Sequence, residues 1–175
     1  MGLCMKEIWS KIEWHLKNHA PRVIETLNPP ASNEEISKLE TTVGKILPAS
    51  VKEYLLIHNG QNDPSRLETL CEEGTLLSVG EIINTWEMLN KINCDLDISN
   101  SEWWHQKYLP LTDVEGDNLA VDLDSGEVVM HVHDSEIEHN IAPSFQHWFE
   151  NKLAIFEEGK FSVDEGYLDY WDYDS

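Results

Sequence analysis

Basic residues are scarce in this sequence. Its 175 residues include 12 Lys and Arg against 33 Asp and Glu, which gives a formal net charge of -21 at pH 7. A surface of that sign repels nucleic-acid phosphates and anionic lipid headgroups, so neither nucleic acid nor membrane is expected as a partner. It attracts basic proteins and speeds their association at low salt. The alternative is that the charge only keeps the protein soluble.

Cysteine is also sparse, and long hydrophobic runs are missing. Cys4, Cys71 and Cys94 form no CxxC motif and no cluster with His, which argues against a disulfide framework and a zinc site. No apolar run approaches the roughly 20 residues of a membrane span. The first residues lack the apolar segment of a secretory signal. We therefore expect a cytoplasmic protein with reduced thiols.

The length fits one domain, and 41% hydrophobic residues with seven Trp indicate a packed core. Apolar residues at helical spacing predict helices at 5–19 and 50–58, and helices that begin near residues 32, 78 and 144. Strand-like runs cover 75–78, 108–112, 118–123 and 127–133, and the last two flank an Asp-Ser-Gly turn at 124–126 that is typical of a β-hairpin. The order predicts an α+β fold: a mainly antiparallel sheet with helices packed on one side.

Two predicted helices carry the same start signal. Ser32 is followed three residues later by Glu35, and Ser78 by Glu81. In such a capping box each side chain satisfies a free backbone donor of the first helical turn. Asn59 and Gly60 tolerate a left-handed backbone and mark the end of the helix before them.

Several short motifs follow one another along the chain in an order that is more specific than any one of them. They are LNPPA (27–31), LP (47–48), IHNGQ (57–61), LPL (109–111), GDN (116–118), VDL (121–123), GEV (126–128) and SF with WF (144–149). Together they resemble the SUKH superfamily, in the Smi/Knr-like branch of fungal cell-wall assembly regulators and bacterial toxin-immunity proteins. The resemblance implies a single SUKH-like domain, taken as residues 1–160, followed by an acidic, aromatic tail at 161–175.

The resemblance also implies a function without catalysis. Bacterial members chiefly bind and neutralise toxins, many of them nucleases, and fungal members are regulatory proteins that act through protein partners. The fungal protein is much longer and has disordered flanks that this chain lacks, which favours a bacterial immunity protein directed against a basic toxin. A regulatory adaptor in cell-wall or signalling assembly is the alternative.

A stretch without any Lys or Arg, residues 108–151, contains ten acidic residues. The hypothesis is that it forms an anionic face for a basic partner; the alternative is a chance bias of exposed loops. The acids taken as partner-binding lie in and around the predicted hairpin: Asp113, Glu115, Asp117, Asp122 and Asp124.

The tail interleaves acids with aromatics, and Tyr170 and Trp171 are its candidate partner-binding residues. Large aromatics are common at binding hot spots. The alternative, which the sequence leaves equally open, is a terminal segment laid across the protein's own surface.

Signatures of catalysis are missing. The sequence contains no GxSxG elbow, no P-loop and no GxGxxG loop. A calcium loop that begins at Asp113 would need Gly and Glu where Asn118 and Asp124 stand. His131, His133 and Asp134 lack an evident fourth ligand for zinc or iron. We therefore expect no catalytic residue, metal or cofactor, and a cryptic metal-dependent enzyme stays as a third hypothesis.

Overall fold

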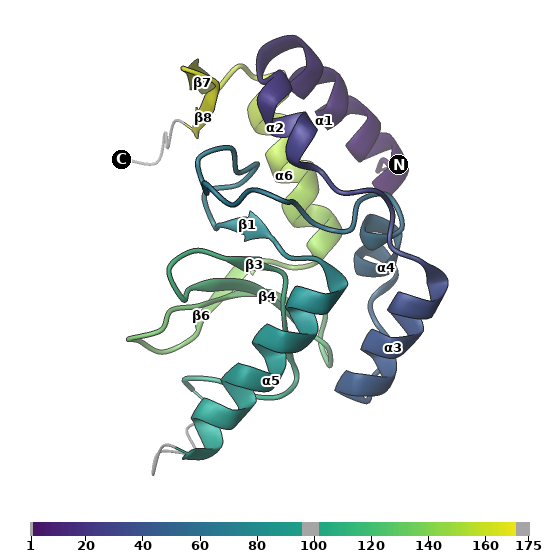
Figure 1. Ribbon diagram of the computed structural model, residues 1–175, viewed down its shortest axis with the longest axis vertical. Coiled ribbons are helices and arrows are strands. Elements are labelled where there is room, and N and C mark those ends of the chain that lie inside the picture. The colour runs from purple at the N-terminus through teal and green to yellow at the C-terminus, as the bar shows by residue number, and fades with distance from the viewer. Residues whose placement is uncertain (1, 96–101, 171–175) are drawn as a thin grey trace.

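A computed structural model describes residues 2–95 and 102–170, in which helices precede and flank a central antiparallel sheet (Figure 1). The helices are α1 (Met5–His19), α2 (Pro21–Thr26), α3 (Asn33–Val43), α4 (Ala49–Leu55), α5 (Val79–Asp95) and α6 (Phe145–Glu157). The strands are β1 (Thr75–Leu76), β2 (Tyr108–Pro110), β3 (Thr112–Asp113), β4 (Asn118–Asp122), β5 (Val128–His131), β6 (Glu138–Ala142), β7 (Phe161–Asp164) and β8 (Tyr167–Tyr170).

Both predicted capping boxes are confirmed. At α3 the Glu35 N–H donates to Ser32 Oγ at 3.1 Å, and the Ser32 N–H donates to Glu35 Oε2 at 2.8 Å. Ser78 and Glu81 make the same pair of bonds at the start of α5, at 3.3 and 2.7 Å. These side chains satisfy donors that the first helical turn leaves free, and they fix where each helix begins.

The main sheet has the strand order β2-β4-β5-β6, and every neighbouring pair is antiparallel. The predicted hairpin is its centre: Val121 pairs with Val128, and Gly126 closes the turn with φ of 82°. A positive φ of that size is accessible to Gly without strain, which explains its place there.

The predicted strand at 108–112 is divided between two sheets. Its first residues, β2, pair with β4, whereas β3 pairs with β1 in a separate two-stranded sheet. Thr112 makes the change possible, because its Oγ accepts the Leu119 N–H at 2.9 Å and donates to the Glu73 carbonyl at 2.6 Å. A side chain thus supplies contacts that a continuous backbone ladder would otherwise make.

The main core lies between the helices and one face of this sheet. Trp9, Tyr54 and Phe149 form an aromatic group with ring centroids 5.1–5.8 Å apart, and Leu119 and Val121 face the same core from β4. α6 brings these parts together because it contacts α1, α4 and β6 (Figure 1). The α+β class with an antiparallel sheet is confirmed.

A second, smaller core covers the opposite face of the sheet. Trp104, Ala120 and Val129 are fully buried there and pack with Leu89 of α5. The first turns of α5 belong to the main core through Ile82. α5 therefore contributes to both cores, so the helices do not all lie on one side of the sheet as predicted. Since both faces of the sheet are covered, all residues of β4 are buried.

Four elements do not appear among the predicted ones. α2 occupies a segment expected to be a turn-rich link, β6 adds an edge strand to the sheet, and β7 and β8 form a hairpin within the predicted tail. The described part of that tail is therefore ordered chain with its own strand pairing.

Candidate partner-binding surface

The five predicted partner-binding acids do not form one cluster. Asp113, Glu115 and Asp117 precede β4, whereas Asp122 and Asp124 lie at its far end. A strand of five residues separates its ends by about 14 Å at 3.4 Å per residue. The hairpin thus presents two acidic ends, and each must be considered separately.

At the first end, two of the acids are already engaged. Asp113 Oδ2 lies 3.2 Å from Arg66 Nη2. Asp117 Oδ1 accepts the His133 N–H at 2.9 Å and lies 2.6 Å from His133 Nδ1. Burial raises the pKa of Asp117, but the contacts with His133 lower it by a larger amount. The net pKa therefore lies below its ordinary value. The same hydrogen bond raises the pKa of His133.

Beside this pair lies a group of exposed acids that we call the acidic corner. The Asp117–His133 contact joins the β3–β4 turn to the β5–β6 loop, and the nearby charges of Asp134 and Glu115 also raise the pKa of His133. The acidic corner consists of Glu115, Asp134, Glu136 and Glu138. None of these four acids forms an ion pair with another described residue.

At the second end, Asp122 does not offer a free charge, which argues against its predicted role as a surface contact. It is 4% exposed, accepts the N–H groups of Asp124 and Ser125 at 2.8 and 3.2 Å, and lies 3.1 Å from Lys107 Nζ. Burial raises its pKa, but these donors lower it to a net value below the ordinary one. Its carboxylate therefore holds the hairpin turn together. Asp124 is exposed and forms an ion pair with Lys45.

Of the two predicted aromatic contacts of the tail, the structure describes Tyr170. Tyr170 is 8% exposed, packs against Phe156 and lies 5.1 Å below the Lys152 ammonium group; its hydroxyl donates to the Leu70 carbonyl. It is thus a core residue, and of the two alternatives for this part of the tail the structure favours packing on the protein itself. Trp171 lies outside the described residues. The division of the chain at residue 160 stays a prediction, although Tyr170 belongs to the main core.

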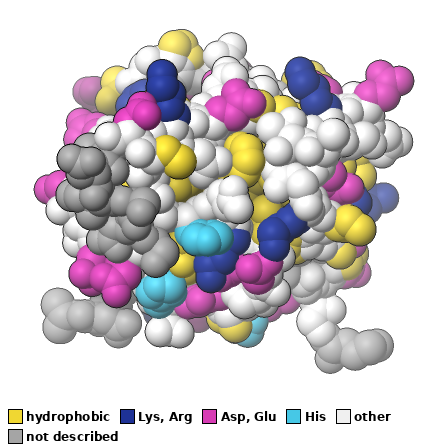
Figure 2. Space-filling model, turned by 90° about the horizontal axis from the view of Figure 1, so that it is seen from below, with side chains coloured by type: hydrophobic (Ala, Val, Ile, Leu, Met, Phe, Trp, Pro, Cys, Tyr) yellow, Lys and Arg dark blue, Asp and Glu magenta, His cyan; other side chains and the backbone are white. Residues whose placement is uncertain are grey.

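The stretch without Lys or Arg is not free of positive charge in space. Arg66, Lys107 and Lys45 reach it from three other parts of the chain. On the face drawn in Figure 2, acidic side chains lie beside Lys, Arg and His side chains rather than in one field of a single sign. Sequence spacing could not reveal these partners, because each pair joins residues far apart in the chain. The role of Asp113, Glu115, Asp117 and Asp124 in binding stays a prediction.

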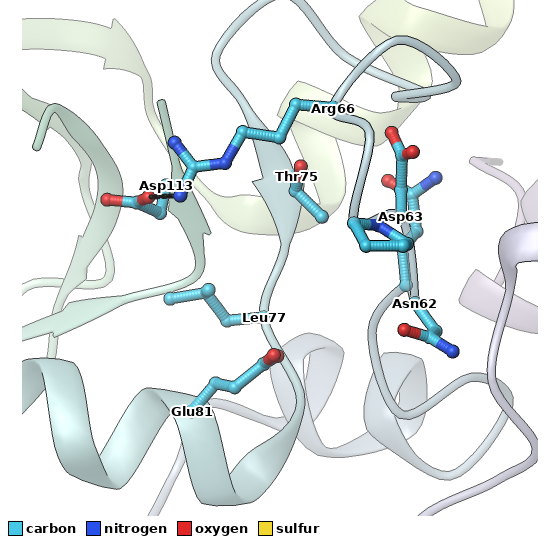
Figure 3. A pocket seen from close by; sticks show the side chains of 9 residues that line it. Asn62, Asp63, Arg66, Thr75, Leu77, Glu81 and Asp113 are labelled. Carbon is cyan, nitrogen blue, oxygen red and sulfur yellow. Dashed lines mark ion pairs between the residues drawn. The ribbon is translucent and has the colours of Figure 1, made fainter. Parts of the chain in front are cut away.

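A polar cavity of about 310 Å³ opens next to the first end of the hairpin (Figure 3). Arg66 extends along one side toward Asp113, while Asn62 and Asp63 lie on the other side and Glu81 rises from α5. The sequence indicated Asp113 as a partner-binding acid and Glu81 only as a capping residue. It gave no sign that the two lie at one cavity, since four separate segments form the walls. Asp113 is the predicted partner-binding acid that lines this cavity.

The histidines singled out in the sequence do not converge on a metal. His131 is fully buried between Trp103 and Trp104, whereas His133 is exposed and bound to Asp117. Within residues 2–95 and 102–170, no group of three or more His, Cys, Asp or Glu side chains is arranged to hold a metal ion. None of the helices in these segments is both long and apolar enough to cross a membrane.

The fold and this surface define a small α+β domain with a charged exterior and a polar cavity. A family model of the SMI1 / KNR4 family (SUKH-1) matches residues 30–151, and the chain belongs to this family. Its members include toxin-immunity proteins and fungal cell-wall regulators rather than enzymes. The match begins after α1 and α2 and ends within α6, so it contains the whole main sheet.

A curated relative is a glucan synthesis regulatory protein from Neurospora crassa. It is 20% identical over 208 aligned residues, which cover 90% of this chain but only 39% of the relative. The chain therefore spans about two-fifths of the length of that protein. The relative is fungal, so a bacterial source for this chain stays a prediction.

Proposed function

We propose that this chain is an immunity-type binding protein that neutralises a basic protein toxin by direct contact. The observation that carries the proposal is the SMI1 / KNR4 (SUKH-1) match over residues 30–151. The net charge of -21 supports a basic partner, because opposite charge steers association and suppresses wrong partners. The immunity role and the nuclease character of the toxin go beyond family membership and are part of the proposal.

The acidic corner is the better candidate for the first contact with such a partner. Its four acids are exposed and lie in the β3–β4 turn, in the β5–β6 loop and at the start of β6, whereas Asp122 is buried and Asp124 is bound to Lys45. Exposed charges at the rim of an interface mainly accelerate association. Charge reversal at Asp122 would not test this role, since the loss of the hairpin turn would weaken binding in any case.

The experiment begins with the product of a toxin-like gene adjacent to this one. The tagged chain should bind that product stoichiometrically and abolish its toxicity in cells. Replacing Glu115→Gln, Asp134→Asn and Glu136→Gln together should weaken binding about three- to tenfold at low salt, mostly through slower association.

The control removes three exposed acids of the same types elsewhere: Glu25→Gln, Glu53→Gln and Asp164→Asn. Equal effects of the two triple variants would reduce the corner to its share of the net charge. If the neighbouring product neither binds nor is neutralised, the immunity proposal fails.

A regulatory adaptor is the second candidate, and the similarity to the glucan synthesis regulatory protein of Neurospora crassa is the observation that favours it. Affinity capture that returns enzymes or scaffolds of cell-wall synthesis, and no toxin, would support the adaptor. Within the described residues the absence of a metal-binding group gives the third hypothesis, a metal-dependent enzyme, no support.

A further inference from the structure

The polar cavity beside β3 has an excess of negative charge that its own cation does not balance. Asp63, Glu81 and Asp113 line it together with a single guanidinium, Arg66. Arg66 is engaged with Asp113 at 3.2 Å. Among the described residues the other two carboxylates meet only neutral donors, so the lining has a formal charge of -2.

The contacts of those two carboxylates are local. Asp63 accepts the Ser65 hydroxyl at 2.8 Å and the Glu68 N–H at 2.9 Å, both within its own loop. Glu81 accepts the Ser78 N–H through Oε2 at 2.7 Å, as a capping residue. Neutral donors satisfy hydrogen bonds without cancelling charge, so the potential inside the cavity stays negative.

Thr75 adds a polar atom without a partner. Its hydroxyl is buried in the wall of the cavity and makes no hydrogen bond with any described residue. A buried hydroxyl that is left unpaired costs free energy, and a bound polar group would recover that cost. The cavity thus combines uncompensated negative charge with a free hydrogen-bonding group (Figure 3).

The size and arrangement of the cavity select the kind of cation. Its volume of about 310 Å³ lies at the lower end of the range for ligand sites, which suits one long side chain better than a large ligand. Among the described residues the carboxylates do not converge closely enough to hold a metal ion. A planar guanidinium can reach separated carboxylates through several donors at once, which a compact ammonium does less well.

We propose that this cavity binds the guanidinium group of an arginine side chain presented by the partner protein. The inference rests on the proposed function for its source of arginine, because a basic protein supplies such side chains. Arg66 and the Asn118 amide already occupy the two oxygens of Asp113, so the incoming arginine faces Glu81 and Thr75 and competes with Arg66 for Asp113. The cavity would then be the site that recognises the partner, and the acidic corner the surface that attracts it.

The test uses the full chain and a blocked pentapeptide of alanine with one central arginine, followed by NMR of backbone amides. Saturable shifts confined to residues around Thr75 and Glu81 are expected. Glu81→Gln should weaken binding about three- to tenfold, the range for losing one charge-assisted contact at a partly exposed site. Gln keeps the capping box, so the helix start is preserved.

Two matched controls lie on α5 at exposed positions. Glu87→Gln removes the same charge as Glu81→Gln, and Lys91→Gln removes the same charge as Arg66→Asn. Arg66→Asn should tighten peptide binding, because it frees Asp113, and Asn tolerates the φ of 58° at this position. Both controls should leave binding within about twofold of the parent protein.

Several outcomes would overturn the inference. Shifts that do not saturate, equal effects of Glu81→Gln and Glu87→Gln, or weaker binding by Arg66→Asn would each show that the cavity is not the site. Agmatine that binds more tightly than the peptide would overturn the assignment to a protein side chain. If the toxin binds but Glu81→Gln leaves its affinity unchanged, this inference fails while the proposed function stands; if no toxin binds, the proposed function fails first.

Discussion

His131 is a buried base surrounded by aromatic rings. Trp103 and Trp104 approach it edge-on at 4.9 and 5.3 Å, Nδ1 lies 3.1 Å from Asn118 Oδ1, and Nε2 has no hydrogen-bond partner among the described residues. Burial lowers its pKa to about 4. The imidazole is therefore neutral at pH 7, and its role is to fill the second core and hold Asn118.

That position predicts a loss of stability in acid. The folded pKa of His131 lies below its unfolded value of 6.5, so the unfolded chain binds the proton first as the pH falls. Stability is full above pH 6.5 and decreases toward pH 4, by about 2 kcal/mol between pH 6.5 and 5. Urea unfolding of His131→Gln at both pH values should show a smaller decrease than the parent protein. His139→Gln, at an exposed position on the neighbouring strand, is the matched control for replacing a histidine by glutamine.

Residue chemistry also sets the limit of what the sequence could predict about the site. The stretch without Lys or Arg indicates the acids in and around the hairpin as candidate contacts. The basic partners of these acids, Arg66, Lys107 and Lys45, could not be predicted, because ion pairs between distant segments leave no spacing signal in the sequence. Asp122 in particular has the local pattern of a loop acid and the contacts of a buried turn residue.

At the scale of elements, signals that are local in sequence predicted well. α1, the starts of α3 and α5, and the β4–β5 hairpin follow from periodicity, capping boxes and turn residues. β6 was missed because four of its five residues are exposed on an edge strand, which removes the alternation that marks a half-buried strand. β7 and β8 were missed because contacts with distant segments support them.

Two glycines with similar φ angles distinguish the cost of a left-handed backbone from the cost of a steric clash. Gly60 and Gly44 have φ of 69° and 72°, but a Cβ at Gly60 would lie 2.5 Å from the Leu77 backbone carbon, while one at Gly44 would meet nothing within 4 Å. Gly44→Ala should cost about 1 kcal/mol of stability, the penalty of a left-handed backbone. Gly60→Ala should cost more than about 3 kcal/mol, because the junction of α4 and β1 must also move. Urea unfolding measures both, and equal costs would contradict the close approach.

The β7–β8 hairpin acts as a strap across the protein. Arg22 donates to the Glu165 carbonyl at 2.9 Å, Phe161 packs against His19 and Phe156, and Tyr170 reaches the loop at Leu70. These contacts join α1, α2 and α6 to the segment that carries the polar cavity. The described part of the tail therefore contributes to stability.

Replacing Tyr170 tests that contribution. Tyr170→Ala should lower the free energy of unfolding by about 3 kcal/mol, because it removes a buried aromatic ring from the main core. Tyr170→Phe should cost about 1 kcal/mol, for the lost hydrogen bond to Leu70. Tyr167→Ala, at a half-buried position of the same hairpin, is the matched control and should cost less than Tyr170→Ala. A Tyr170→Ala protein as stable as the parent would make the hairpin a free arm.

For the whole molecule, most of the few basic residues are already in use. Eight of the 12 Lys and Arg form ion pairs among the described residues. With 33 acids against 12 Lys and Arg, acidic charge is in large excess whichever pairs form. Mutual repulsion of the remaining acids destabilises the compact state and at the same time attracts a basic partner.

Added salt should therefore stabilise the free protein and weaken its binding to a basic partner. Between about 0.01 and 1 M salt the Debye length falls from about 30 to 3 Å, which screens repulsion among dispersed acids more than it weakens pairs in contact. The free energy of unfolding at about pH 7.5 should rise with NaCl, measured by thermal unfolding across that range. The triple variant Glu25→Gln, Glu53→Gln and Asp164→Asn should start more stable at low salt and gain less. Stability that falls with added salt would show that the ion pairs outweigh the repulsion among the acids. The excess negative charge would then not destabilise the folded protein, although it would still attract a basic partner.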